Sequence, residues 1–369
     1  MRFQNVLMVL LLAMASSWIV SCSSKSSPSG PSNNPTNTPT STLTSQFTST
    51  PSATKTNTAT STVTGTPTIT QTPGLTATPT GTSTPSATAT RTATTTPTGT
   101  PTPFGTPSYI MSYSAANPQG MARTGTTLYI AAGGNVLIYD TGDLSTPVNT
   151  WSAYDTIAFS NVVGVAINPT NGNVYVADEG NESVYQFTSA GATVNASSFS
   201  FSDVEGIAAD LNGNLYVADT YKPAVYEFGP SQGSPLATWT AASGKSIDSP
   251  TGVSTDSSNN LYIATASGSQ QYIFKFAAGS TTSVLNTWVT GDYYIYQMVV
   301  DGSGNVYAAE YGNEMVDAFV PGTSTAISSW DGSQGGGSAF QGPDGIIFLS
   351  NGDILVADLE ASELQEYRP

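Results

Sequence analysis

The sequence predicts an all-β fold, a six-bladed β-propeller with four-stranded blades that follows a disordered stalk rich in Ser, Thr and Pro. A unit of short apolar strands recurs six times, and the spacing from Gly120 to Gly345 gives a mean period of 45 residues. A period of this length is typical of one propeller blade of four strands. In addition, the last unit has no fourth strand, and the segment Tyr109–Tyr113 before the first unit has the pattern of such a strand.

Residues 206–228 show the repeated unit most clearly. Gly206–Asp210 is expected to be a short apolar strand, Leu215–Ala218 a second strand after an Asn-Gly turn, and Val225–Phe228 a third strand with alternating faces. A single sheet of this kind cannot bury both of its faces, so it needs the neighbours that repetition supplies. The corresponding position in the other units is occupied by Gly120, Gly164, Gly252, Gln297 and Gly345.

A fourth strand is expected between units, marked by an aromatic residue after small polar ones. The marker residues are Trp151, Trp239, Trp288 and Trp330. The unit around residues 194–201 has no Trp, and we expect Phe199 or Phe201 to replace it. No fourth strand follows the last unit, but Tyr109–Tyr113 has the same pattern. We therefore expect the N-terminal strand to complete the last blade and close the ring, which removes its open edge.

Residues 1–21 are predicted to form a lipoprotein signal peptide. Arg2 precedes an apolar run, Val6–Ala13, which is short for a membrane span of about 20 residues. Residues 19–22 read Ile-Val-Ser-Cys and resemble a bacterial lipobox, so Cys22 is the predicted lipidation site. The alternative is an ordinary signal peptide in which the cysteine occurs by chance.

Residues 22–107 are predicted to be the lipidated cysteine and a disordered linker. This segment consists mainly of Thr, Ser and Pro, and it cannot bury enough apolar surface to offset the entropy of the chain. We expect it to act as a flexible spacer, and such tracts can also carry O-linked sugars. The propeller domain is predicted to span residues 108–369.

Composition excludes several functions for this domain. The chain has one cysteine and no histidine, so it lacks an internal disulfide, the commonest general base and the commonest metal ligand. From Ser108 onward there are five basic and 25 acidic residues, a net charge of −20. This charge repels phosphate backbones, so no nucleic-acid partner is expected, and it favours cations or basic partners.

The unit sequence resembles the NHL repeat family over about residues 108–369. The resemblance lies in Gly-Ile-Ala-x-Asp followed by Gly-Asn-Leu-Tyr-Val-Ala-Asp, and it is strongest in the units that start at Gly164, Gly206 and Gly345. It implies a six-bladed propeller. The Asn-His-Arg of the family's longer loop is absent, so the cationic face of RNA-binding relatives does not carry over. Related enzymes are calcium lactonases, which need a central cluster of carboxylates and amides, and lyases that rely on histidine.

One face of the ring is expected to be acidic. The innermost strands begin on the face where the loops between second and third strands open, and these loops carry Asp178, Glu179, Glu182, Asp219, Glu310, Glu314, Asp358 and Glu360. The repeated Asp178, Asp219 and Asp358 are interpreted as mainly structural, because a short carboxylate can bind the amides of its own loop. The candidate binding face consists of Asp219, Glu310, Tyr221, Tyr294, Tyr296 and Tyr311.

A calcium site is the only cofactor site that the sequence suggests. Glu205, Asp344 and Gln119 lie at the starts of innermost strands and could bind one Ca²⁺ together with carbonyl oxygens, the ligands that calcium prefers. Solvated carboxylates are the alternative interpretation. Residues Asp301–Asn305 lack the alternating acids of a calcium loop and are interpreted as a hairpin turn.

The predicted function is that of a non-catalytic binding or scaffold propeller that recognises a protein, peptide or glycan on its acidic face. A calcium-dependent, lactonase-like hydrolase and a purely structural envelope protein are the alternatives. The protein is expected to be exported and anchored to a membrane by the lipid on Cys22. Because Ser23 rather than Asp follows the cysteine, the outer membrane or the cell surface is expected if the host is a diderm.

Overall fold

The computed structural model describes residue 105 and residues 107–266, 270–291 and 294–369. The predicted signal peptide, Cys22 and nearly all of the predicted stalk lie outside these residues. Within the described part, no helix is both long enough and apolar enough to cross a membrane.

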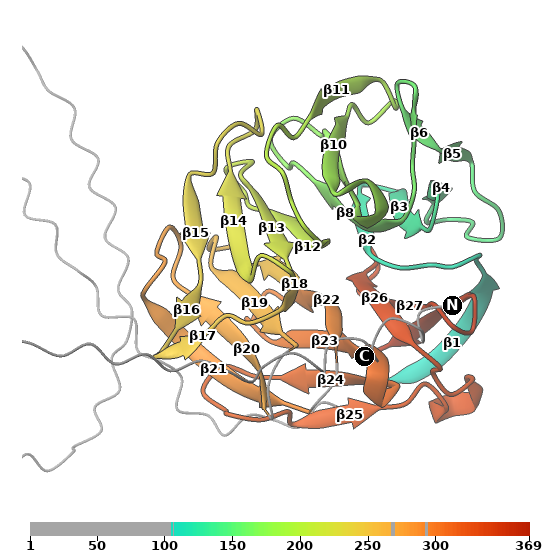
Figure 1. Cartoon of the computed structure of the whole chain (residues 1–369). Coiled ribbons are helices and arrows are strands. Elements are labelled where there is room, and N and C mark those ends of the chain that lie inside the picture. Colours follow the sequence, from blue (N-terminus) through green and yellow to red (C-terminus); the bar gives the residue numbers. More distant parts are fainter. Residues whose placement is uncertain (1–104, 106, 267–269, 292–293) are drawn as a thin grey trace, which may run out of the picture. The chain divides into compact units, whose positions relative to one another are not determined.

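Six four-stranded antiparallel sheets are arranged around a common centre as the blades of a propeller, which confirms the predicted fold (Figure 1). The innermost strands are β2 (Met121–Thr124), β8 (Val162–Ile167), β12 (Val204–Ala209), β18 (Pro250–Thr255), β22 (Ile295–Val300) and β26 (Pro343–Phe348). The second strands are β3 (Thr127–Ala132), β9 (Val174–Asp178), β13 (Leu215–Asp219), β19 (Leu261–Thr265), β23 (Val306–Glu310) and β27 (Ile354–Asp358). The third strands are β4 (Asn135–Asp140), β10 (Ser183–Phe187), β14 (Ala224–Phe228), β20 (Gln271–Phe276), β24 (Met315–Phe319) and β28 (Glu363–Arg368). The outer strands are β5 (Asn149–Trp151), β11 (Thr193–Ala196), β15 (Ala237–Trp239), β21 (Val284–Thr290), β25 (Ser328–Trp330) and β1 (Ser108–Ser114).

We number the blades 1 to 6 in the order of these strands. Among the described residues, two small hairpins and three short 3₁₀ helices lie between these strands. The hairpins are β6 (Ala153–Tyr154) with β7 (Ile157–Ala158) and β16 (Ala241–Ala242) with β17 (Lys245–Ser246). The helices are η2 (Glu179–Asn181), η3 (Tyr311–Asn313) and η4 (Gln334–Gly336).

The N-terminal strand closes the ring, as the sequence predicts. Strand β1 pairs antiparallel with β28, from Ser108 opposite Arg368 to Ser114 opposite Glu363. In Figure 1 the teal β1 therefore lies beside the red strands of the C-terminal blade. Blade 6 thus joins both ends of the described chain.

Aromatic residues of the outer strands pack between neighbouring blades. Trp151 of blade 1 lies 5.0 Å from Phe187 of blade 2 between ring centroids, and Trp239 of blade 3 lies 6.4 Å from Phe276 of blade 4. In blade 2 the centroid of the buried Phe201 lies 5.9 Å from that of Phe228 in blade 3. The ring centroid of Phe199 lies 5.5 Å from that of Phe228 as well, so both predicted residues fill the place of the missing Trp, from the segment that follows β11.

Glycine allows the innermost strands to approach one another closely near their starts. A Cβ atom on Gly206 would lie 2.4 Å from the carbonyl oxygen of Thr251, and one on Gly345 would lie 2.2 Å from that of Gln119. No side chain fits at such distances. Blade 5 departs from this arrangement because it has Gln297 at the corresponding position.

The repeated aspartates hold the loops, which confirms their structural interpretation. Asp219 is buried, and its carboxylate accepts hydrogen bonds from the amides of Ser202 (3.0 Å), Asp203 (3.1 Å) and Lys222 (3.1 Å). Asp178 and Asp358 accept bonds from the corresponding amides of blades 2 and 6.

In blades 3, 4 and 5 the turn between first and second strands is closed by an aspartate: Asp210, Asp256 and Asp301. The amides of Ser303 and Asn305 donate to Asp301 at 2.8 and 2.9 Å. The segment is a hairpin turn, as predicted.

Candidate functional site

The start of each innermost strand and the loop between the second and third strands of the same blade lie on one face of the ring. Backbone bonds join the two, as in Thr220 N–H to Asp203 O (2.9 Å) and Tyr311 N–H to Tyr294 O (2.9 Å). We call this the channel-entry face. The tight turns between first and second strands occupy the opposite face.

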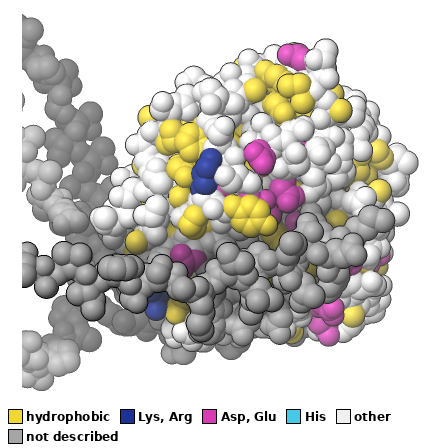
Figure 2. Space-filling model, viewed as in Figure 1, with side chains coloured by type: hydrophobic (Ala, Val, Ile, Leu, Met, Phe, Trp, Pro, Cys, Tyr) yellow, Lys and Arg dark blue, Asp and Glu magenta, His cyan; other side chains and the backbone are white. Residues whose placement is uncertain are grey.

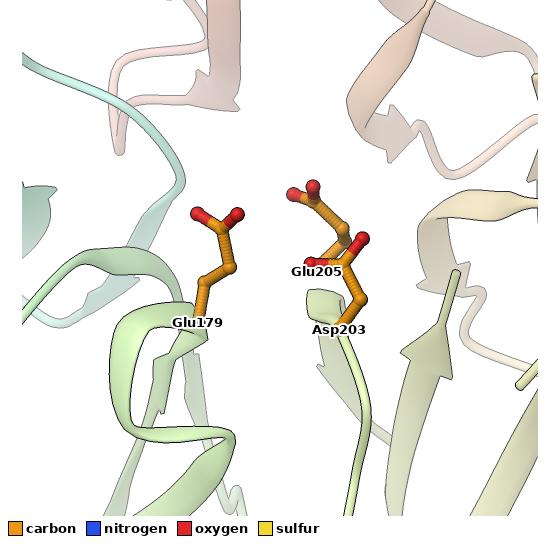
Figure 3. A group of neighbouring side chains, drawn as sticks. All are labelled: Glu179, Asp203 and Glu205. Atoms are coloured by element: carbon orange, nitrogen blue, oxygen red, sulfur yellow. The ribbon is translucent and has the colours of Figure 1, made fainter. Parts of the chain in front are cut away.

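Three carboxylates meet on the channel-entry face. One carboxylate oxygen each of Glu179, Asp203 and Glu205 lies within 4.8 Å of the other two. Figure 3 shows Glu179 extending from one blade, and Asp203 and Glu205 from the next, into the same gap. We call these residues the acidic triad.

Local structure brings the triad together. Asp203 and Glu205 are two residues apart at the start of β12, and side chains two apart on an extended chain lie on the same side. Glu179 is the first residue of η2 and directly follows the buried Asp178, whose carboxylate caps that helix. The side-chain amide of Asn161 donates to Glu179 and orients its carboxylate.

The triad offers only oxygen ligands, which suit Ca²⁺, and its negative charge equally suits a Lys or Arg side chain of a partner. Glu205, one of the predicted metal ligands, is therefore part of an acidic cluster. The other two, Asp344 and Gln119, are 4 and 5 % exposed at the starts of β26 and β2 and do not belong to the triad. A shared site of Glu205, Asp344 and Gln119 stays a prediction.

Tyrosines of blade 5 form a second feature of the channel-entry face. The rings of Tyr294 and Tyr296 stack with centroids 5.8 Å apart and an interplanar angle of 8°, and Tyr296 meets Tyr311 edge-on at 5.7 Å. The Tyr311 hydroxyl donates to the exposed Glu360 at 2.5 Å. Tyr294 is 46 % exposed, so one face of the stack is open. We call Tyr294, Tyr296 and Tyr311 the tyrosine platform.

Two residues of the predicted binding face are not on the surface. Asp219 is 0 % exposed and Glu310 is 1 % exposed, so neither can contact a partner. Asp219 is occupied by loop amides, and Glu310 turns inward at the end of β23. Tyr221, in contrast, is 76 % exposed. Tyr293, which adjoins the platform in sequence, lies outside the described residues.

Glu310 is buried beside a second acid. It has the position that Asp178, Asp219 and Asp358 have in other blades, but its carboxylate makes no capping bond to η3. Burial, and next the charge of Asp317 on β24, raise the pKa of Glu310 to about 8. Burial also raises the pKa of Asp317. Burial beside a second acid therefore favours the neutral, protonated form of Glu310.

Sequence reasoning missed Asp203 and Gly342. Asp203 was detectable in principle, because it precedes Glu205 by two residues at the start of a predicted strand. Gly342 leaves room for the platform, since a Cβ atom there would lie 2.8 Å from both Tyr311 and Glu360. This contact joins two blades, and no local pattern indicates it.

On the side seen in Figure 2, acidic side chains and hydrophobic side chains lie next to one another near the middle of the visible surface. This mixture is what a surface that binds a partner requires, because apolar area supplies contact and charge supplies selectivity.

Comparison with known proteins identifies the fold. No protein-family model and no curated protein matches the chain. Among solved structures, the WD40 β-propeller domain of Doa1 is similar, with a TM-score of 0.52 and 12 % identity over 68 % of this chain and 78 % of that chain. The chain is thus a repeat protein of the β-propeller class. A fold shared at this identity does not carry an activity with it.

Proposed function

We propose that the protein is a non-catalytic binding propeller that holds a protein, peptide or glycan partner on its channel-entry face. The observation that carries this proposal is the open tyrosine platform on the same face as the acidic triad. Exposed tyrosines supply a large contact area at a low cost in side-chain entropy. The carboxylates add an attraction for basic groups, so we favour a protein or peptide segment that is rich in Lys and Arg.

Charge also affects the rate of encounter. The net charge of −20 from residue 108 onward attracts basic partners at a distance, and salt weakens this attraction. A neutral glycan would stack on the tyrosine platform and bind almost independently of salt. Salt dependence therefore separates the two classes of partner.

The test is a binding assay with the full chain, using a panel of 12-residue peptides that contain several Lys or Arg and matched peptides with Gln in their place. We expect the basic peptides to bind more tightly and to lose affinity as NaCl is raised. Tyr294→Ala should weaken binding about tenfold, the loss expected for an aromatic contact worth roughly 1.4 kcal/mol. Leu211→Ala, on the opposite face, is the matched control and should bind as the natural chain does.

Other outcomes decide between the alternatives. Salt-independent binding of oligosaccharides that is lost in Tyr294→Ala would identify a glycan partner. Equal affinities for the natural chain and Tyr294→Ala would contradict the assignment of the platform. No binding in either panel would favour a purely structural envelope protein.

We also propose that the propeller is an NHL-type protein that is displayed at the cell envelope as a lipoprotein, anchored through Cys22. The lipobox-like residues 19–22 and the Thr/Ser/Pro-rich segment support this proposal. In cells fed a labelled fatty acid, the natural chain should incorporate the label and Cys22→Ser should not. Label in Cys22→Ser would contradict the anchor.

Cation binding at the acidic triad is a second candidate function, and the convergence of three carboxylates favours it. The activity that such a site would serve is that of a calcium-dependent hydrolase. Millimolar CaCl₂ should then raise the melting temperature (Tm) of chelator-treated protein. A site saturated about 100-fold adds about 2.7 kcal/mol, or roughly 5 to 10 °C in a domain of this size. Glu205→Gln should abolish the increase, whereas Glu182→Gln, an exposed acid outside the triad, should keep it. An unchanged Tm would exclude this candidate.

A further inference from the structure

The central channel contains a cavity that the predicted site does not use. It has a volume of about 320 Å³, and its walls come from all six innermost strands. The lining includes the ends of these strands, such as Ile167, Ala209 and Thr255. The cavity therefore lies toward the face opposite the channel-entry face.

Gln297 lines the cavity and is hydrogen-bonded to the innermost strands of two other blades. Its side-chain oxygen accepts bonds from the amides of Met121 (3.0 Å) and Ile346 (2.9 Å), and its side-chain nitrogen donates to the Met121 carbonyl (2.5 Å). Gln297 belongs to blade 5, whereas Ile346 and Met121 belong to blades 6 and 1. The carboxamide thus joins three successive blades inside the channel, at the level where glycines bring the other strands together.

These bonds also show what the channel wall recognises. The innermost strand of each blade has no further strand of its own sheet on the channel side. Some of its backbone groups there already have partners, such as the Ala209 carbonyl, which accepts a bond from the Thr255 hydroxyl (2.9 Å). The side-chain amide of Gln297 is one planar group, with a carbonyl oxygen, that backbone groups of these edges bind. The wall residues are otherwise mainly aliphatic, so a ligand with one polar group and an apolar part matches them.

Arg123 gives the cavity its charge. It is the only ionisable residue among those that line the cavity. Its guanidinium donates to the carbonyls of Phe348 (3.1 Å) and Gly125 (2.6 Å), which uses two of its five N–H groups.

The other cations of the described part have an acidic or aromatic partner: Lys275 with Asp256, Arg368 with Asp353, Lys222 over Phe199 and Lys245 over Tyr272. Arg123 has neither kind of partner in the described part. It therefore sets a positive charge at a cavity within a strongly acidic domain.

We propose that this cavity binds a small organic monocarboxylate, whose carboxylate pairs with Arg123 and whose apolar part lies against the innermost strands. The cavity volume equals that of about ten water molecules at about 30 Å³ each, so it admits about ten non-hydrogen atoms. An arginine guanidinium is well suited to a carboxylate because it can donate two parallel bonds. The site is independent of the channel-entry face and of any partner held there.

The test uses the full chain with sodium benzoate, neutral benzamide as the shape control, and NaCl at equal ionic strength. At ten times its dissociation constant, benzoate should raise Tm by about 3 to 6 °C, and benzamide and NaCl should not. Arg123→Gln should abolish the increase, Arg123→Lys should retain part of it, and Lys245→Gln, a cation outside the cavity, should retain all of it. An equal effect of benzoate and NaCl, or full binding by Arg123→Gln, would overturn the proposal.

A second measurement needs no variant. With ¹³C-labelled methionine methyl groups, benzoate should shift the signals of Met121 and Met298, which line the cavity. The signals of Met111 in β1 and Met315 in β24 should stay in place, since neither lines it. Shifts at Met111 or Met315 alone, or no shift at all, would show that the cavity does not hold the carboxylate.

Discussion

Blade 5 differs from the other blades at two positions that repeat around the ring. Where five blades have glycine, Gln297 extends into the channel to Ile346 of blade 6 and Met121 of blade 1. Where three blades have a loop-capping aspartate, Glu310 is one methylene longer and lies buried beside Asp317. The same blade carries the tyrosine platform. Residues that depart from a repeat no longer serve the common blade, so these side chains are the first candidates for a function specific to this protein.

The Glu310–Asp317 pair predicts that stability depends on pH. Because the pKa of Glu310 rises from 4.5 to about 8 on folding, the folded chain binds more protons than the unfolded chain between these values. The stabilisation is complete below about pH 4.5 and is lost as pH rises through about 8. Glu310→Gln keeps the neutral form, so its Tm should fall less between pH 5 and pH 9 than that of the natural chain.

Each tenfold difference in proton affinity between the folded and the unfolded chain changes the free energy of unfolding by about 1.4 kcal/mol. In a domain of this size that corresponds to a change in Tm of about 3 to 6 °C. Glu314→Gln is the matched control, since Glu314 is an exposed acid of the same blade. If Glu310→Gln and Glu314→Gln have the same pH profile, folding does not raise the pKa of Glu310.

At the scale of elements, the ring depends on one strand that is far from its partner in sequence. Strand β1 is paired with β28 along six residue pairs, and Tyr109 packs edge-on against Tyr367. Without β1, blade 6 would expose the free edge of β28 and lose the contact that joins the chain ends. The pairing of β1 with β28 therefore stabilises the whole ring and not only one blade.

Deletion of residues 108–114 should lower Tm strongly. Each lost ladder bond costs about 0.5 kcal/mol or more, so a total near 3 kcal/mol corresponds to roughly 6 to 12 °C. Deletion of residues 92–98, which come from the Thr/Pro-rich segment, should leave Tm unchanged. A melting curve of the 108–114 deletion that coincides with the natural one would mean that β1 does not hold the ring closed.

The elements could be predicted because their signals are local, and the site could not because its contacts cross between blades. Trp151 and the Asn-Gly turns mark strands by neighbouring residues alone, and the absence of a last strand indicated the closure by β1. The acidic triad depends on the distance between Glu179 in one blade and Glu205 in the next. The span of Gln297 to Met121 depends on the width of the channel, which no residue pattern encodes.

At the scale of the molecule, the two faces have different chemistry. The channel-entry face presents the acidic triad and the tyrosine platform, and the opposite side leads to a cavity with the single charge of Arg123. Gln297 joins blades 5, 6 and 1 inside the channel. A partner on one face and a small ligand on the other could therefore be bound at the same time.

The net charge of −20 from residue 108 onward predicts that salt stabilises the domain. Like charges repel in the compact state, and the screening length falls from about 30 Å at 0.01 M to about 8 Å at 0.15 M salt. At pH 7 we expect Tm to rise by a few degrees when NaCl increases from 0.01 to 0.3 M. Near pH 4.1, the isoelectric point that the sequence of the whole chain gives, most of the negative charge of the domain is lost and most of the increase should be lost with it. A Tm that falls with salt at pH 7 would show that attractive pairs such as Lys275–Asp256 outweigh the repulsion. The acidic surface would then act as a set of local ion pairs and not as one electrostatic field that attracts basic partners.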